Sequence, residues 1–173
     1  ALAAEKVKLG VQGAHSGDLA SYGVPSLNAV KIVVDDINAR GGILGEAVEV
    51  IAQDDQCKPE MGTSAATKLI SDKVAAVVGP ICSGATTASL PLFGNAETIT
   101  VSPTATTPQL TEDGKYPLFF RTVAKDNSQA KLASDFILNK LKAKKIAYLH
   151  DNGDYGKGFA DYTRDFMEKG GAE

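Results

Sequence analysis

Hydrophobic and polar positions along the chain follow two periods, which predict a series of strands and helices. Short runs of β-branched and apolar residues predict strands, and the run that ends at Gly79 is nearly all apolar, as in a strand buried on both faces. Stretches with apolar residues three or four positions apart predict helices. The predicted strands are 7–11, 48–52, 74–79, 98–101 and 145–149, and the predicted helices are 25–40, 59–71, 84–95, 128–141 and one that opens near residue 156.

The order of these elements predicts an α/β fold. The first part alternates strand and helix, which is typical of a parallel sheet with helices on both faces. A long loop rich in Thr, Pro and Gly follows at 102–116, and 119–123 is interpreted as a short extended crossover. After it come only a helix, one strand and another helix, which do not make a domain core. We therefore expect the chain to be truncated.

Composition supports a globular protein and narrows its partners. Hydrophobic residues make up 43% and charged residues 23%, and the formal net charge is -3. Lys and Arg are scattered, so neither nucleic acid nor an anionic lipid surface is a predicted partner. No apolar run approaches the roughly 20 residues that a membrane-spanning helix needs, so we expect no direct membrane insertion. Residues 1–5 are interpreted as the remainder of a signal-peptidase site or as a flexible terminus.

The two cysteines each follow a predicted strand. Cys57 and Cys82 can therefore lie at one end of the sheet. An even number of cysteines in a secreted chain is compatible with one disulfide. Two unrelated buried thiols are the alternative, and spacing alone leaves both open.

Ligands of an open parallel sheet bind outside the carboxyl ends of the strands. Two such loops here are rich in hydroxyls, 79–87 and 102–108. Ser83 is a fair helix N-cap with free N–H groups beyond it, and a helix N-terminus favours an anion. The sequence therefore indicates a carboxylate site, with ordinary capping and turn formation as the alternative for any single hydroxyl.

Catalytic patterns are not found. The turn after the first strand lacks the G-x-G-x-x-G fingerprint, 153–158 lacks the spacing of a phosphate loop, and Ser83 is not within G-x-S-x-G. His15 and His150 are too few for a metal cluster. Asp54-Asp55 is interpreted as a solvated strand end. We predict no enzyme, cofactor or metal.

Several stretches of the chain match one family in order and spacing. They are Val33-Val34-Asp35-Asp36-Ile37-Asn38-Ala39-Arg40-Gly41-Gly42-Ile43-Leu44-Gly45, Asp54-Asp55-Gln56-Cys57, Gly79-Pro80-Ile81-Cys82-Ser83, Ser102-Pro103-Thr104-Ala105-Thr106-Thr107-Pro108-Gln109-Leu110-Thr111 and His150-Asp151-Asn152-Gly153-Asp154-Tyr155-Gly156-Lys157-Gly158. On these the whole chain resembles the leucine/isoleucine/valine-binding group of type I periplasmic solute-binding proteins.

The resemblance implies two Rossmann-like lobes that close on a ligand about a hinge. Residues 1–121 would form lobe one, and 122–173 the first part of an incomplete lobe two. The protein would be periplasmic, with its signal peptide removed, and monomeric at full length. It would deliver an amino acid, with leucine, isoleucine and valine leading, to the membrane permease of an ABC importer. A ligand-sensing domain of a receptor or regulator, or a binding protein for another small carboxylate or amide, is the alternative.

The resemblance also implies residue roles. Ser83 would bind the ligand carboxylate, next to a disulfide between Cys82 and Cys57. The backbone carbonyl of Thr104 would accept from the α-ammonium, and Thr106 would contribute its hydroxyl and N–H. Two aromatic side chains, Tyr155 from the second lobe and Tyr22 from the first loop, would line the ligand.

Overall fold

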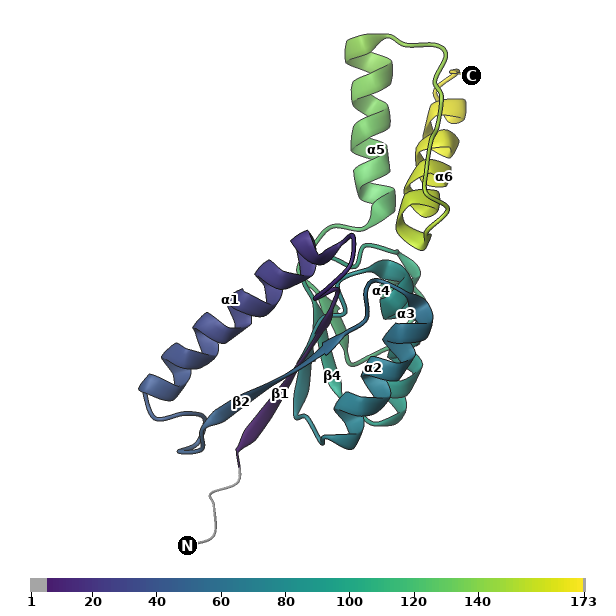
Figure 1. Ribbon diagram of the computed structural model, residues 1–173. Helices are drawn as coiled ribbons and strands as arrows, with labels where there is room; N and C mark the ends of the chain where they lie inside the picture. Colours follow the sequence, from purple (N-terminus) through teal and green to yellow (C-terminus); the bar gives the residue numbers. More distant parts are fainter. Residues whose placement is uncertain (1–5, 173) are drawn as a thin grey trace, which may run out of the picture.

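The computed structural model describes residues 6–172 and shows a five-stranded parallel sheet in the order β2-β1-β3-β4-β5 (Figure 1). The predicted α/β class is confirmed. The strands are β1 (Val7–Gly13), β2 (Val48–Asp54), β3 (Ala76–Val78), β4 (Ile99–Ser102) and β5 (Phe119–Arg121).

Helices cover both faces of the sheet, as the strand–helix alternation predicts. One face carries α1, and α2 packs beside α3 on the other (Figure 1). A further pair, α5 and α6, lies beyond the carboxyl ends of the strands. The helices are α1 (Ala20–Ala39), α2 (Pro59–Ser71), α3 (Ser83–Asn95), α4 (Gln109–Glu112), α5 (Asp126–Phe136), the π-helical turn η1 (Ile137–Leu141) and α6 (Asp154–Lys169).

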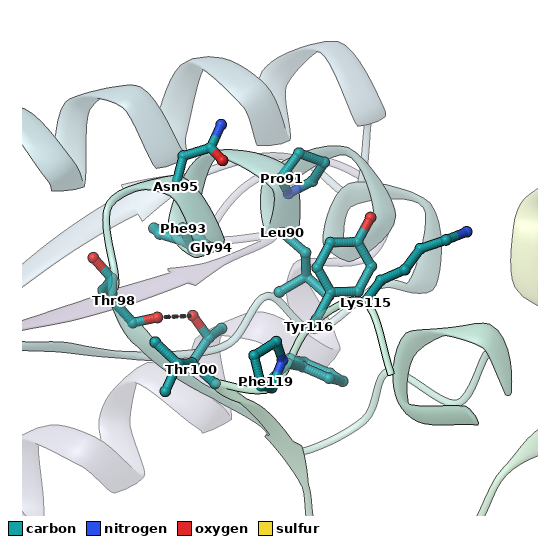
Figure 2. Close-up of a pocket in the computed structure, with 12 residues that line it drawn as sticks. Leu90, Pro91, Phe93, Gly94, Asn95, Thr98, Thr100, Lys115, Tyr116 and Phe119 are labelled. Atoms are coloured by element: carbon teal, nitrogen blue, oxygen red, sulfur yellow. Dashed lines mark hydrogen bonds between the residues drawn. The ribbon is translucent and has the colours of Figure 1, made fainter. Parts of the chain in front are cut away.

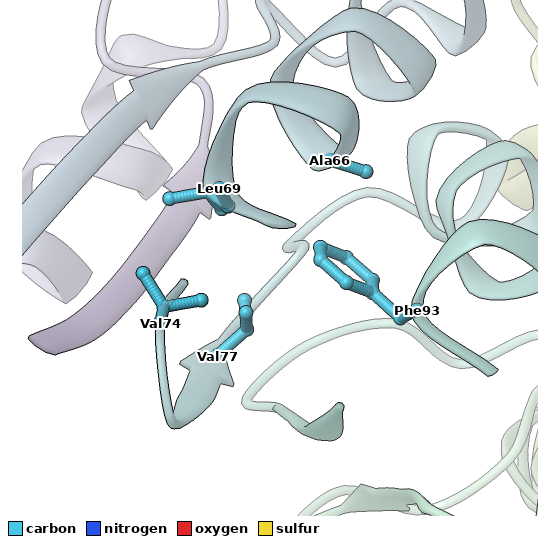
Figure 3. Close-up of a cluster of buried hydrophobic side chains, with 5 residues drawn as sticks. All are labelled: Ala66, Leu69, Val74, Val77 and Phe93. Carbon is cyan, nitrogen blue, oxygen red and sulfur yellow. The ribbon is translucent and has the colours of Figure 1, made fainter. Parts of the chain in front are cut away.

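The main core lies between the sheet and the α2–α3 face. It consists of buried side chains from α2, α3, β3 and the segment just before β3, shown in Figure 3: Ala66, Leu69, Val74, Val77 and Phe93. Leu69 is fully buried. Since a fully buried Val, Leu or Phe side chain adds about 1.5–3 kcal/mol, this cluster stabilises the packing of α2 and α3 on the sheet.

The end of β3 needs a glycine. Gly79 has a φ of 112°, and a Cβ built there would lie 2.0 Å from the backbone oxygen of Gln12. Its N–H donates to Val101 O (2.8 Å), which extends the β3–β4 pairing by one residue. Any side chain at 79 would therefore push β1 away from the start of the next loop.

The predicted strand 145–149 is wrong. These residues form no strand, although their side chains alternate: Ile146 and Tyr148 are half-buried, whereas Ala147 and Leu149 are exposed, Leu149 by 90%. A strand is defined by hydrogen bonds to a neighbour, and the part of the chain that the structure describes provides none at this segment. Periodicity detects the alternation but not the missing neighbour.

Other differences are small. Residues 119–121 pair with β4 as β5 instead of forming only a crossover, and the loop 102–116 contains the short helix α4. Helix α1 begins five residues before Pro25, where the prediction began it. Proline favours the first turn of a helix, but here it lies inside one.

Residues 6–172 contain no helix that is both long and apolar enough to cross a bilayer. The interpretation of residues 1–5 as a signal-peptidase remnant lies outside the described residues.

Candidate functional site

Ser83 lies at the first position of α3, beyond the carboxyl end of β3. Its side chain is buried, and its Oγ accepts a hydrogen bond from the N–H of Thr106 (3.3 Å). Because the oxygen accepts from the protein, the hydroxyl proton remains to be donated to a ligand. Ser83 and Thr106 come from neighbouring strand-end loops, as predicted, and the structure brings them together.

The N-terminus of α3 is suited to an anion. Within the described residues, no side chain caps its first turn, so the first N–H groups remain available to donate to a ligand. The carboxylate of Asp154, from the start of α6, lies 3.5 Å from the point where a Cβ on Gly84 would be. A negative group is thus already drawn towards this end of the helix, as the helix dipole favours.

Thr104 and its loop are tied to the loop that carries Ser83. The Thr104 hydroxyl donates to Ile81 O (2.6 Å), and Ser102 Oγ donates to Pro80 O (2.5 Å) while accepting from Ala105 N (3.0 Å). The Thr104 hydroxyl is therefore used within the protein. Its N–H donates to Ser102 Oγ (3.4 Å), so its backbone carbonyl is the group left for a ligand.

The disulfide joins the second and third loops. Cys57 and Cys82 are linked, with their Cα atoms 5.3 Å apart, within the usual range. The bridge is placed directly before Ser83, so it holds the start of α3 against the end of β2.

A buried polar network supports this bridge. The carboxylate of Asp55 accepts from the N–H of Cys57 (2.9 Å) and from Gln12 Nε2 (3.2 Å), and Gln12 Nε2 also donates to Ser89 Oγ (2.9 Å). All three polar side chains, on Gln12, Asp55 and Ser89, are fully buried. Burial raises the pKa of the Asp55 carboxyl, and hydrogen bonds from Cys57 N and Gln12 partly oppose that rise. The interpretation of Asp55 as solvated is wrong, because the α2–α3 layer covers it.

Its neighbour Asp54 behaves in the opposite way. Asp54 accepts from the N–H groups of His15 (2.8 Å) and Gln56 (3.0 Å) and from the Ser16 hydroxyl. Burial pushes the pKa of Asp54 up, but these hydrogen bonds outweigh it, and the pKa is lowered. Asp54 thus fixes the first loop to the end of β2 in its charged form.

The two predicted aromatic residues lie on the surface. Tyr22 is in the first turn of α1 and is 67% exposed; Tyr155 is in the first turn of α6, is 50% exposed and stacks on Phe159 (ring centroids 6.1 Å apart). In the described part of the chain, neither makes a hydrogen bond with the predicted hydroxyl and backbone site residues. Tyr155 follows Asp154, whose carboxylate lies beside Gly84, and the contact of either ring with a ligand stays a prediction.

Sequence reasoning missed Asp126. It is the first residue of α5, where an acidic residue signals only a helix start. In the structure its N–H donates to Thr106 O (3.0 Å) and its side chain is 1% exposed. Burial raises the pKa of this carboxyl, and the nearby Thr106 hydroxyl and the Arg121 guanidinium oppose the rise.

A cavity of about 560 Å³ lies where α6 faces the sheet region, and Asp126 contributes to its lining. Gln109 Nε2 donates to Tyr162 Oη (3.1 Å) across this junction. The lining includes Thr87 of α3, Thr107 of the loop after β4, and Asp154, Lys157 and Gly158 of α6. This cavity therefore adjoins the Ser83–Thr106 site.

A second cavity, of about 350 Å³, is remote from the site (Figure 2). It is lined by Leu90 and Phe93 near the end of α3, by Thr98 and Thr100, and by Phe119 at the start of β5. These positions belong to the amino ends of β4 and β5. None of the predicted site residues lines it, so we place the site at the opposite edge.

A family model described as periplasmic binding protein matches residues 6–173. Two relatives are an amino acid binding protein of Pseudomonas aeruginosa, 40% identical over 96% of this chain and 45% of the relative, and the Leu/Ile/Val-binding protein of Escherichia coli, 37% identical over 98% and 46%. The chain thus spans about half the length of these relatives. The matched family consists of binding proteins, so the prediction that the chain is not an enzyme is confirmed.

Solved structures of substrate-binding proteins share the fold of this chain. The branched-chain amino acid transporter substrate binding protein LivJ of Streptococcus pneumoniae, in complex with isoleucine, is 36% identical with a TM-score of 0.84, over 93% of this chain and 46% of that one. A solute binding protein of an ABC transporter from Rhodopseudomonas palustris, in complex with 3,4-dihydroxy benzoic acid, is 27% identical with a TM-score of 0.83, over 97% and 45%.

Proposed function

Since the chain belongs to the family of periplasmic binding proteins, whose solved members share its fold, we propose that it forms part of a solute-binding protein that captures an amino acid between two lobes. Leucine, isoleucine and valine are the leading ligands, because relatives named for them are 34–37% identical to this chain. The protein would act in the periplasm and deliver the amino acid to the membrane permease of an ABC importer.

The observation that carries the proposal is the arrangement at Ser83. Its hydroxyl proton is available, it lies at the uncapped N-terminus of α3, and the N–H of Thr106 is within hydrogen-bond distance of its oxygen (3.3 Å). An ionised carboxylate entering here would accept from the Ser83 hydroxyl and from free N–H groups. Such charge-assisted bonds are short and about twice as strong as neutral ones.

The remaining residues take their roles around that carboxylate. The backbone carbonyl of Thr104 accepts from the α-ammonium, and the hydroxyl and N–H of Thr106 lie beside it. Tyr155 and Tyr22, both exposed, would move onto the ligand as the lobes close. The lobes are 1–121 and 122 onwards, with closure about the crossover that leaves β5.

The cellular setting follows from the same features. The Cys57–Cys82 disulfide persists in an oxidising compartment such as the periplasm. We further propose that the full-length protein is a monomer that needs no cofactor and binds neither nucleic acid nor the bilayer directly. The permease would recognise its closed form.

A different carboxylate is the second candidate ligand. It is favoured by the likeness to the Rhodopseudomonas palustris protein, whose structure holds an aromatic acid without an amino group. The carboxylate part of the site would serve both ligands.

Replacing Ser83 tests the proposal. In the full gene product, Ser83→Ala should weaken leucine binding by about 10- to 100-fold, because it removes a hydrogen bond to a charged group worth roughly 1.5–3 kcal/mol. Isothermal titration calorimetry measures the affinity, and the melting temperature without ligand should stay within a few degrees.

Ser64→Ala on the exposed face of α2 is the matched control, since it removes a helix serine hydroxyl that donates within the protein instead (to Glu60 O, 3.2 Å). It should leave the affinity unchanged. Equal leucine affinity in Ser83→Ala and the parent would contradict the carboxylate role.

A further inference from the structure

Asp126 is a buried acid without a partner for its carboxylate. The side chain is 1% exposed, and among residues 6–172 neither carboxylate oxygen has a hydrogen-bond donor within normal geometry. Its Oδ2 lies 3.9 Å from the point where a Cβ on Gly158 of α6 would be. A buried, unpaired carboxylate is costly, so its presence at this junction points to a function.

The nearest cationic side chain is already engaged elsewhere. The guanidinium of Arg121 donates to the carbonyls of Ala105 (3.2 Å), Thr107 (2.8 Å) and Pro108 (3.3 Å), and to the Thr111 hydroxyl. These bonds hold the loop after β4 in place. Arg121 therefore lends Asp126 long-range attraction but, within the described residues, donates no hydrogen bond to it.

The nearest hydroxyl is that of Thr106, and it is also unpaired in the described part of the chain. The two residues are joined through their backbones, because Asp126 N donates to Thr106 O (3.0 Å). A hydrogen bond from the Thr106 hydroxyl to the carboxylate agrees with the lowering effect that this hydroxyl has on the pKa of Asp126. The charged carboxylate can only accept, so the direction of that bond is fixed.

That direction decides what the Thr106 oxygen offers to a ligand. A hydroxyl has one proton; once Asp126 takes it, only lone pairs face the site, and they accept from a donor. At Ser83 the polarity is the reverse, because its oxygen accepts from Thr106 N (3.3 Å) and its proton is left for a ligand. One donating and one accepting hydroxyl, side by side, match the carboxylate and the ammonium of an α-amino acid.

We propose that Asp126 is a specificity-determining residue that accepts the Thr106 hydroxyl proton and thereby restricts the site to carboxylates that carry an adjacent ammonium group. This inference rests on the proposed function and deepens it, because it separates amino acids from simple organic acids. Asp126 acts here as a positioning residue, through the Thr106 hydroxyl alone.

The test uses the full gene product and two probes, leucine and isocaproate, which is leucine without its amino group. Asp126→Asn should lower leucine affinity by about tenfold or more and change isocaproate affinity by less than about twofold, so that the preference for leucine collapses. Asp165→Asn is the matched control, since Asp165 lines the same cavity but is exposed, and it should keep the parent's preference. Thermal unfolding of each variant establishes that it is folded.

A double-mutant cycle with Thr106→Val separates positioning from direct contact. If Asp126 acts through the hydroxyl, Asp126→Asn should have less than about a twofold effect on leucine affinity in the Thr106→Val background. An undiminished effect there, or an unchanged preference for leucine in Asp126→Asn alone, would overturn the inference while the proposed function stands. A parent protein that binds neither probe would overturn the proposed function, and the inference with it.

Discussion

The sheet region up to Arg121 and the helical pair formed by α5 and α6 obtain their order in different ways. In the sheet region each strand has a hydrogen-bonded neighbour, and most of the buried apolar side chains gather there. In the described residues after 121, only Ala130, Met167 and Ala172 are buried apolar residues, whereas Leu132 is 73% and Leu149 90% exposed. The sheet region has a core of its own, and the helical pair has an interface but little core.

The difference shows that the burial of an apolar side chain depends on whether a neighbouring element covers it. Helices α5 and α6 meet along small and polar positions, where Ser134 Oγ donates to Thr163 O (3.3 Å). Their larger apolar side chains, such as those of Leu132 and Phe136, face outward. We therefore expect substitutions in the two regions to differ most where the residue type is the same.

The largest expected effect contrasts two leucines. Leu69→Ala should lower the free energy of unfolding by about 2–5 kcal/mol, because it leaves a cavity in the main core. Leu132→Ala should change it by less than about 0.5 kcal/mol, since this side chain is 73% exposed. Urea unfolding of the 173-residue chain measures both. Equal losses would show that the exposed face of α5 is covered in solution.

The disulfide provides the next largest effect. Replacing Cys57 and Cys82 together by Ser opens a loop with a sequence separation of 25 residues. This should lower the free energy of unfolding by about 3 kcal/mol in the chain-entropy model. Adding a reductant to the parent should reproduce the loss and leave the double variant unaffected. If the parent loses nothing on reduction, Asp55 and its network alone hold the loop.

The smallest effect concerns the two adjacent aspartates. The pKa of Asp55 is raised in the folded state, so its contribution to stability is present below about pH 4, the unfolded value, and is lost as pH rises through the folded value. The pKa of Asp54 is lowered, so its contribution is present above about pH 4 and is lost as pH falls through the folded value.

Urea unfolding at about pH 3 and about pH 7 separates the two aspartates. Relative to the parent, Asp55→Asn should become more stable as pH rises, whereas Asp54→Asn should become less stable. The comparison uses slopes with pH, because the lost hydrogen bonds add a constant offset to each variant. Equal slopes in the parent and both variants would contradict the assignment.

Most of the fold could be predicted from the sequence because it depends on local periodicity. Helix α2 was predicted from 59 to 71 and observed with the same bounds, since its apolar spacing and Pro59 are local signals. The segment 145–149 has an equally clear pattern but forms no strand, because pairing depends on a neighbour that local sequence does not reveal.

The candidate site divides in the same way. Ser83 and Thr106 could be located because strand-end loops and helix starts are readable in the sequence. Asp55, Gln12 and Asp126 could not, because a polar residue in a strand or at a helix start gives no sign of being buried by distant elements. Whether the predicted roles of Thr104, Tyr22 and Tyr155 hold stays a prediction.

Gly79 has no side chain, yet it restricts which sequences can adopt this fold. Because a Cβ there would meet the Gln12 carbonyl at 2.0 Å, even the smallest substitution displaces β1 from the loop that leads to Ser83. We therefore expect substitutions at Gly79 to be harmful, whereas many substitutions at the exposed Leu132 should be neutral. In a library of random variants, losses of binding should therefore accumulate at a residue that contributes no side chain at all.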